Sequence, residues 1–167
     1  MTVPSARLST TDVACWVLKA NPQTYDLLAQ WHQQGPFKVG GWVPLRRTYR
    51  LDLMAPGQRC LLWVSGPEAP GIYAIGTLTG VVQDNSRGGG KYWRDPVKAR
   101  QLGPGVPIKV APLSTPVPRT DLMQQAAFQN AEFVRMAAGS NPSYLDPDQF
   151  KVVQAHLQAA DMTAAGW

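Results

Sequence analysis

The sequence predicts an α+β protein in which a small, twisted β-barrel carries helices on its outside. Short apolar runs typical of buried strands are separated by turns rich in glycine and proline, which number 15 each in 167 residues. Helix signals occur once near the start of the chain and again only near its end. Gly76 and Gly80 interrupt one long apolar run, where they permit the bending that a small barrel needs.

The first half of the chain is expected to contain one helix between strands. Residues 13–19 are apolar up to Lys19 and are predicted to form a buried strand. Asn21 and Pro22 then predict a helix start, because Asn is favoured at the N-cap and Pro at the first helical position. Further strands are expected at residues 45–54, 59–65 and 72–83.

The second half is expected to contain a long loop, one strand and two helices. Residues 84–100 are polar, basic and rich in glycine, which is typical of a long loop that is either functional or disordered. The strand at 106–110 contains Pro107, which has no backbone N–H and is therefore expected at a sheet edge. One helix is predicted from Thr120 to about residue 138, and a second after the capping sequence that begins at Asp146.

We expect a single domain over residues 12–160, with a flexible N-terminus at 1–11 and a C-terminal tail at 161–167. No signal peptide or membrane-spanning run is recognised, so a cytoplasmic location is expected. The two cysteines, Cys15 and Cys60, lie in apolar runs and are expected to be buried free thiols. No metal site and no cofactor are predicted, because no Cys and His cluster has ligand spacing.

Charge is unevenly distributed along the chain. Residues 1–119 hold 14 Lys and Arg against 6 Asp and Glu, whereas residues 120–167 hold 2 against 5. The β-rich part is therefore basic, which favours an anionic partner such as nucleic acid. Its cations form two groups in the sequence: Lys38, Arg46, Arg47 and Arg50, and then Arg87, Lys91, Arg94, Lys98 and Arg100.

Six tryptophans are the most informative residues of the chain. Trp16 and Trp63 lie in apolar strands and are expected in the core. Trp42 and Trp93 lie among glycine, proline and basic residues, where an indole ring suits stacking on a flat ligand better than burial. For Trp42, a role as a hydrophobic plug over the barrel end is an equal alternative.

Catalytic patterns are incomplete. Ser65 has no histidine near it in the predicted fold, and Asp84 and Asp95 are expected to cap turns. The glycine run before Lys91 departs from a phosphate-binding loop, because Tyr92 stands where Ser or Thr must bind magnesium. The sequence therefore predicts a binding protein rather than an enzyme.

The order of these pieces resembles an EVE domain of the PUA-like superfamily. The stretches that carry the resemblance are 15–22, 41–42, 46–47, 56–66, 71–76 and 139–150. The resemblance implies a barrel of five or six mixed strands with three or more peripheral helices. It also implies a reader of modified bases in DNA or RNA, since EVE domains are similar to YTH domains, which read N6-methyladenine.

The same resemblance implies roles for individual residues. Asn21 corresponds to a residue that contacts the base edge, Trp42 to a cage tryptophan, and Trp93 or Tyr92 to a second cage aromatic, with Ser65 and Gly66 in the pocket wall. Ala20 and Val43 depart from the YTH pattern, which argues against N6-methyladenine as the ligand. The residues expected to contact phosphates are Lys19, Arg46, Arg47, Lys91 and Arg94.

Two alternatives remain at this point. Some PUA-like relatives, the ASCH domains, include nucleic-acid hydrolases, but their Gly-x-Lys-x-x-Glu-x-Arg pattern is not found around Glu68 or Glu132. The other alternative is a module that binds a small metabolite. The expected partners are DNA or RNA bearing a modified base and an effector protein, with no membrane contact, and the chain is expected to be a monomer.

Overall fold

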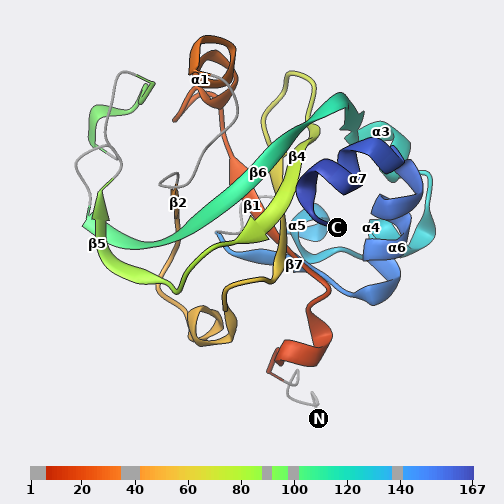
Figure 1. The fold of residues 1–167 in the computed structure, drawn as a ribbon, viewed down its shortest axis with the longest axis horizontal. Coiled ribbons are helices and arrows are strands. Elements are labelled where there is room, and N and C mark those ends of the chain that lie inside the picture. The colour runs from red at the N-terminus through yellow and green to blue at the C-terminus, as the bar shows by residue number, and fades with distance from the viewer. Residues whose placement is uncertain (1–6, 35–41, 88–91, 98–101, 137–140) are drawn as a thin grey trace.

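The computed structural model describes residues 7–34, 42–87, 92–97, 102–136 and 141–167. Its strands form one strongly curled sheet in the order β2-β6-β4-β3-β1-β7, with β5 paired to β6 as well (Figure 1). The predicted α+β class and PUA-like fold are confirmed, and the predicted small barrel is a sheet curled into a half-barrel. Seven strands are present in the described residues, rather than five or six, and two of them are only three residues long.

The strands are β1 Cys15–Ala20, β2 Trp42–Pro44, β3 Arg59–Val64, β4 Gly71–Leu78, β5 Gln83–Arg87, β6 Leu102–Pro118 and β7 Ser143–Leu145. The helices are η1 Thr10–Asp12, α1 Leu27–Gln34, η2 Tyr49–Leu53, α3 Arg119–Leu122, α4 Ala126–Gln129, α5 Glu132–Arg135, α6 Pro147–His156 and α7 Ala159–Ala165. No described helix has the length and apolar character needed to span a lipid bilayer.

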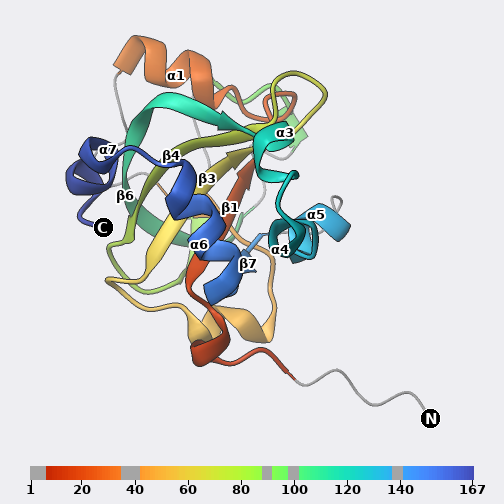
Figure 2. The same cartoon turned by 90° about the vertical axis from the view of Figure 1, so that its right-hand side faces the viewer.

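One parallel strand pair fixes which chain segments meet at the end of the sheet. β1 and β3 are parallel, so Ala20 and Val64 end side by side. β4 runs antiparallel to β3 and begins beside Val64 at Gly71, and β6 ends there at Pro118. Helix α1 lies beyond this end of the sheet in both views, whereas η1 lies at the opposite end (Figures 1 and 2).

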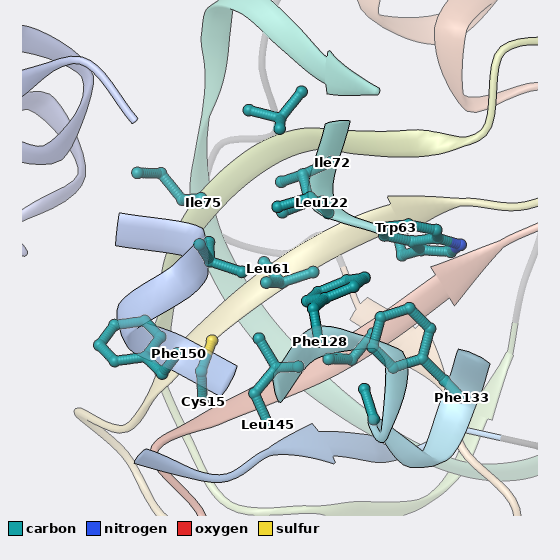
Figure 3. Close-up of a cluster of buried hydrophobic side chains, with 14 of the residues drawn as sticks. Cys15, Leu61, Trp63, Ile72, Ile75, Leu122, Phe128, Phe133, Leu145 and Phe150 are labelled. Carbon is teal, nitrogen blue, oxygen red and sulfur yellow. The ribbon is translucent and has the colours of Figure 1, made fainter. Parts of the chain in front are cut away.

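The two faces of the sheet support two separate cores. On the face covered by helices, Trp63 packs with Phe128 and Phe133, and the Trp63 and Phe133 ring centroids are 4.8 Å apart (Figure 3). On the concave face, Trp16 packs among the aliphatic residues of β3, β4 and β6. Both tryptophans are at most 4% exposed, which confirms their predicted core positions.

Both cysteines are buried free thiols, as predicted, and they lie in different cores. Burial raises the pKa of the Cys15 and Cys60 thiols well above their ordinary value. These thiols are therefore inert small apolar groups rather than nucleophiles.

The predicted strand at 45–54 was wrong: β2 ends at Pro44, residues 45–48 have no regular secondary structure, and Tyr49–Leu53 forms the 3₁₀-helix η2. Thr48 caps this helix by accepting the Arg50 backbone N–H. Arg50 binds Glu132 through two hydrogen bonds of 2.6 and 2.5 Å, between residues 82 positions apart in the chain. Alternating residues at 45–53 predict a strand, and no local pattern indicates the contact between Arg50 and Glu132.

The single helix predicted for 120–138 is instead three short helices, α3, α4 and α5. Phe128 and Phe133 both contact Trp63, yet five residues of a continuous helix would turn them about 140° apart. A break between α4 and α5 lets both rings reach the same partner. The long loop predicted for 84–100 likewise begins with a strand, β5, because this segment pairs with β6.

Strand β6 is much longer than the predicted 106–110. It has β4 and β5 along one side, whereas on its other side β2 pairs with it only over residues 105–107. On the side of β6 away from β4, no described strand pairs with residues 108–118, so these residues form a sheet edge. Pro107, the residue expected at an edge, is itself paired with Trp42 of β2. Three further prolines in this stretch lack the N–H that an added strand would need.

The end of the chain packs onto the sheet. The Trp167 indole N–H donates to the Gly76 carbonyl at 2.8 Å, and its ring lies 5.3 Å from the Phe150 ring. The boundary expected at residue 160 therefore falls inside α7. Before it, α6 begins as predicted, since Asp146 accepts the Gln149 N–H and Gln149 accepts the Asp146 N–H in a capping box.

Candidate functional site

The ends of the two parallel strands bring three predicted site residues together. The backbone N–H and the hydroxyl of Ser65 both donate to the Ala20 carbonyl, at 2.9 and 3.3 Å. Gly66 follows with φ of +114°, a conformation that favours glycine. A Cβ atom placed on Gly66 would lie 3.9 Å from Oδ1 of Asn21. We call the surface formed by Asn21, Ser65 and Gly66 the β1–β3 end.

Asn21 is exposed and shapes a turn rather than capping α1. Its Oδ1 accepts the Gln23 N–H at 2.9 Å, and its carbonyl accepts the Thr24 and Tyr25 N–H groups. The predicted helix start at Asn21 was wrong, because the Asn side chain bonds within its own turn. Within the described residues, no acceptor is bound to the Asn21 side-chain NH2, so this donor is available to a ligand.

Helix α1 begins at Leu27, and Asp26 supplies its cap. Asp26 Oδ1 accepts the Ala29 N–H at 3.0 Å, and this bond holds the pKa of the Asp26 carboxyl below its ordinary value. The same carboxylate forms an ion pair with Arg94. Asp26 therefore connects the helix start to the segment that carries the predicted site residue Arg94.

The backbone of residues 92–95 is fixed against the turn that Asn21 begins. Tyr25 and Trp93 form an isolated antiparallel bridge. The Asp26 N–H donates to the Tyr92 carbonyl at 2.8 Å, and the Arg94 N–H donates to the Thr24 carbonyl at 2.8 Å. These bonds fix Trp93 and Arg94 against residues 24–26, in the turn that follows Asn21.

The aromatic rings of this segment are unequally exposed. The Tyr25 ring meets Trp93 edge to face at a centroid distance of 5.2 Å, and Tyr92 at 6.5 Å. Tyr92 is 8% exposed and donates its hydroxyl to Gln33 Oε1 at 3.0 Å, whereas Trp93 is only half-buried. Of the two aromatics predicted for a cage, Trp93 is therefore the more accessible.

Tyr25 was not among the predicted site residues, although it contacts both aromatics. Burial, and to a smaller extent the nearby Tyr92, raises the pKa of the Tyr25 hydroxyl to about 12. The hydroxyl is therefore protonated at neutral pH and donates to Gln30. A single Tyr between polar residues carries no local signal for this role, which depends on the fold bringing residues 25 and 93 together.

A second group of predicted site residues is joined through Asn141. The Lys19 N–H donates to Asn141 Oδ1 at 2.6 Å, and the Asn141 side-chain NH2 donates to the Lys19 carbonyl at 2.9 Å. The Asn141 carbonyl accepts the Arg46 N–H at 2.9 Å. Lys19 is half-buried, and desolvation lowers the pKa of its ammonium, while the charge of Glu132 acts in the opposite direction.

The arginines of this group differ in their partners. Arg46 is exposed, and its side chain has no ion-pair partner among the described residues. Arg47 forms an ion pair with Asp84 at 2.8 Å, and both side chains are mostly exposed. Asp84 thus lies in β5 beside Arg47 rather than capping a turn, whereas Asp95 accepts the Val97 N–H as a turn cap should.

Two predicted site residues, Lys91 and Trp42, are not fully described by the structure. Lys91 lies outside the described residues. The backbone of Trp42 begins β2, where it pairs with Pro107 of β6, and its side chain lies outside the described part of the structure. The structure therefore brings Asn21, Ser65, Gly66, Trp93 and Arg94 to one end of the sheet, and it joins Lys19 to Arg46 through Asn141.

The described residues contain no group of three or more His, Cys, Asp or Glu side chains suited to a metal ion. What the site offers is an exposed amide donor, a half-buried indole and several exposed guanidinium groups. Such groups bind planar, hydrogen-bonding and anionic ligands.

Comparison with known proteins agrees with this fold. A protein-family model, the EVE domain, matches residues 14–156. No match was found among curated proteins. Among solved structures, a protein from Pseudomonas putida is 19% identical with a TM-score of 0.61, over 85% of this chain and 98% of that one.

Two further structures are similar to the same degree. A hypothetical protein from Leishmania major is 18% identical with a TM-score of 0.60, over 87% of this chain and 94% of that one. The DUF55 domain of human thymocyte nuclear protein 1 is 15% identical with a TM-score of 0.57, over 84% and 96%. At such low identities these structures establish the shared fold and do not identify a ligand.

Proposed function

This chain belongs to the EVE domain family, and we propose that it binds nucleic acid and reads a modified base without catalysing a reaction. The observation that carries the proposal is the β1–β3 end. There an exposed Asn amide with an available donor lies beside a glycine that leaves space, and the Trp93 segment is bonded to the same turn. This agrees with the base-edge role that the family resemblance gives to Asn21.

In the proposed mechanism, the modified base leaves its stack and is held by stacking on Trp42 and Trp93. Unstacking a base costs a few kcal/mol, and stacking on an aromatic side chain returns about 1–3 kcal/mol for each ring. The Asn21 NH2 donates to an acceptor on the base edge, since its Oδ1 is already bonded to Gln23. The groups added by the modification fill apolar space near the rings.

Phosphate contacts supply the remaining affinity. We assign them to Lys19, Arg46, Arg47, Lys91 and Arg94, of which the described arginines are exposed. Because each neutralised phosphate releases counterions, affinity should fall as the salt concentration rises. A neutral metabolite would bind equally well at both salt concentrations, which separates the metabolite alternative from this proposal.

The test is a binding screen with short single- and double-stranded oligonucleotides. Each carries one methylated base, methylated cytosine first, or its unmodified counterpart, at two salt concentrations. We expect tighter binding of one modified oligonucleotide, and we expect Trp42→Ala and Asn21→Ala to abolish that preference. Asn130→Ala is the matched control, because Asn130 is also exposed and its amide bonds only the Ala126 carbonyl of its own helix.

Equal affinity of every variant for every oligonucleotide would refute the proposed site. If the oligonucleotide were cleaved, or became abasic, after incubation with the protein, the result would instead favour a nucleic-acid hydrolase.

A further inference from the structure

Building on the proposed function, we infer that Asn141 is a positioning residue for nucleic-acid binding, which holds Lys19 and Arg46 in register so that their side chains contact phosphates of one strand. Asn141 lies in the 139–150 stretch that resembles the family, but none of the site roles drawn from YTH domains includes it. It is 122 positions from Lys19 in the chain, so only the fold brings the two together.

The strand register explains how Asn141 holds Lys19. β7 pairs antiparallel with β1, with Cys15 opposite Leu145 and Val17 opposite Ser143. Continuing the same register places Asn141 opposite Lys19. There the side-chain amide makes both hydrogen bonds to the Lys19 backbone, at 2.6 and 2.9 Å, in place of the backbone groups that a strand residue would use.

Because the Asn141 side chain makes the hydrogen bonds to Lys19, the Asn141 backbone carbonyl can bind a different partner. Its carbonyl accepts the Arg46 N–H, two residues after β2 ends at Pro44. β2 and β7 are the two ends of the strand order, so this contact connects opposite edges of the curled sheet. Asn141 therefore fixes the backbone of Arg46 relative to that of Lys19.

Lys19 and Arg46, joined in this way, differ in burial and in local secondary structure. Lys19 is half-buried on a strand, and Arg46 is exposed on a segment without regular secondary structure. The bond to Asn141 places the Arg46 backbone relative to β1, while the adjacent Leu45 N–H is bonded to the Pro104 carbonyl of β6. A cation in a fixed position loses less conformational entropy when it binds a phosphate than one on a loose segment does.

The inference is tested by the salt dependence of binding to an oligothymidylate of about 12 nucleotides, which has phosphates but no modified base. Asn141→Asp keeps the acceptor for the Lys19 N–H but replaces the donor with an oxygen that repels the Lys19 carbonyl. Asn141→Ala removes both bonds. We expect each variant to reduce the slope of log affinity against log salt by about 0.7 to 1.4, corresponding to one or two lost phosphate contacts.

A double-mutant cycle distinguishes positioning from loss of folded protein. Arg46→Ala should weaken binding less in the Asn141→Asp background than in the wild type, because Arg46 is already misplaced there. Arg94→Ala should weaken binding equally in both, since Arg94 is held by the turn at 24–26. A variant that merely unfolded part of the sample would lower the binding capacity and leave the slope unchanged.

An unchanged slope in both Asn141 variants, together with salt-dependent binding by the wild type, would overturn this inference and leave the proposed function intact. If the wild type itself did not bind the oligothymidylate in low salt, the phosphate contacts of the proposed function would fail as well.

Discussion

Trp63 and Trp93 show how two regions of this protein use the same residue type differently. Trp63 lies under the short C-terminal helices, 4% exposed, with Phe128 and Phe133 against its ring. Trp93 lies at the end of the sheet, half-buried, with Tyr25 edge to face against it. The first ring is enclosed by the core, whereas the second keeps an accessible part that a ligand can use.

The comparison extends to the polar groups of the two regions. On the helix-covered face, the buried hydroxyl of Ser143 donates to the Glu132 carboxylate, which also binds Arg50. At the β1–β3 end, Asn21 is exposed with an available donor. The helix-covered region therefore contributes mainly to stability, and the sheet end is suited to binding.

The largest expected effect is that of Trp63→Ala on stability. Removing a buried indole leaves a cavity beside two aromatic rings, and the expected loss is about 3–5 kcal/mol in the free energy of unfolding. Chemical denaturation measures it, and Trp63→Phe should lose less because a ring remains. If Trp63→Ala unfolded at the same denaturant concentration as the wild type, the assignment of this region to stability would be incorrect.

Trp93→Ala should reduce affinity for nucleic acid more than it reduces stability. We expect affinity for a bound oligonucleotide to fall about 5- to 150-fold, the equivalent of one stack of 1–3 kcal/mol. Stability should fall by less than in Trp63→Ala, because the Trp93 ring is only half-buried, and the lost pairing with Tyr25 accounts for about 0.5–1.5 kcal/mol beyond the lost burial. Titration and denaturation of the same sample measure both quantities, and Val97→Ala, at a 67% exposed neighbour, serves as the control. A large loss of stability with unchanged affinity would reverse the comparison.

A smaller effect is expected where the Arg50–Glu132 pair anchors helix α5. The hydrogen bonds from Arg50 hold the pKa of the Glu132 carboxyl below its ordinary value of 4.5. The pair therefore stabilises the folded state at pH values above 4.5, and this contribution is lost as the pH falls through the lowered pKa. At neutral pH, we expect Glu132→Gln to lower the unfolding free energy by about 1 kcal/mol.

Denaturation between pH 7 and pH 3 tests this expectation. The difference in stability between the wild type and Glu132→Gln should shrink with acidification, because protonation removes the charge that the substitution has already removed. A difference that stayed constant over this range would show that the pair contributes through shape rather than charge.

Some parts of the fold could be predicted from local patterns alone. Continuous apolar runs identified β1 and β3, and with them the burial of both core tryptophans and both cysteines. The capping box at Asp146 identified the start of α6. In each case the signal lies within a few neighbouring residues, and burial or capping follows from their chemistry.

Other parts depended on contacts between distant residues. The η2 helix and the breaks among α3, α4 and α5 follow from the Arg50–Glu132 pair and from two Phe rings sharing Trp63. At the site, the resemblance implied that Asn21 and Gly66 share a pocket, but it assigned no role to Tyr25 or Asn141. Neither residue has a local pattern that distinguishes it from a surface polar or aromatic residue.

By itself, the sequence determined the class of fold, its buried strands and the family to which the chain belongs, because apolar periodicity and residue order are local properties. Only the tertiary structure decided that the turn after β1 holds Trp93 and that Asn141 bonds Lys19 through its side chain and Arg46 through its backbone carbonyl. These arrangements depend on the direction and curl of a sheet, which bring together residues as much as 122 positions apart.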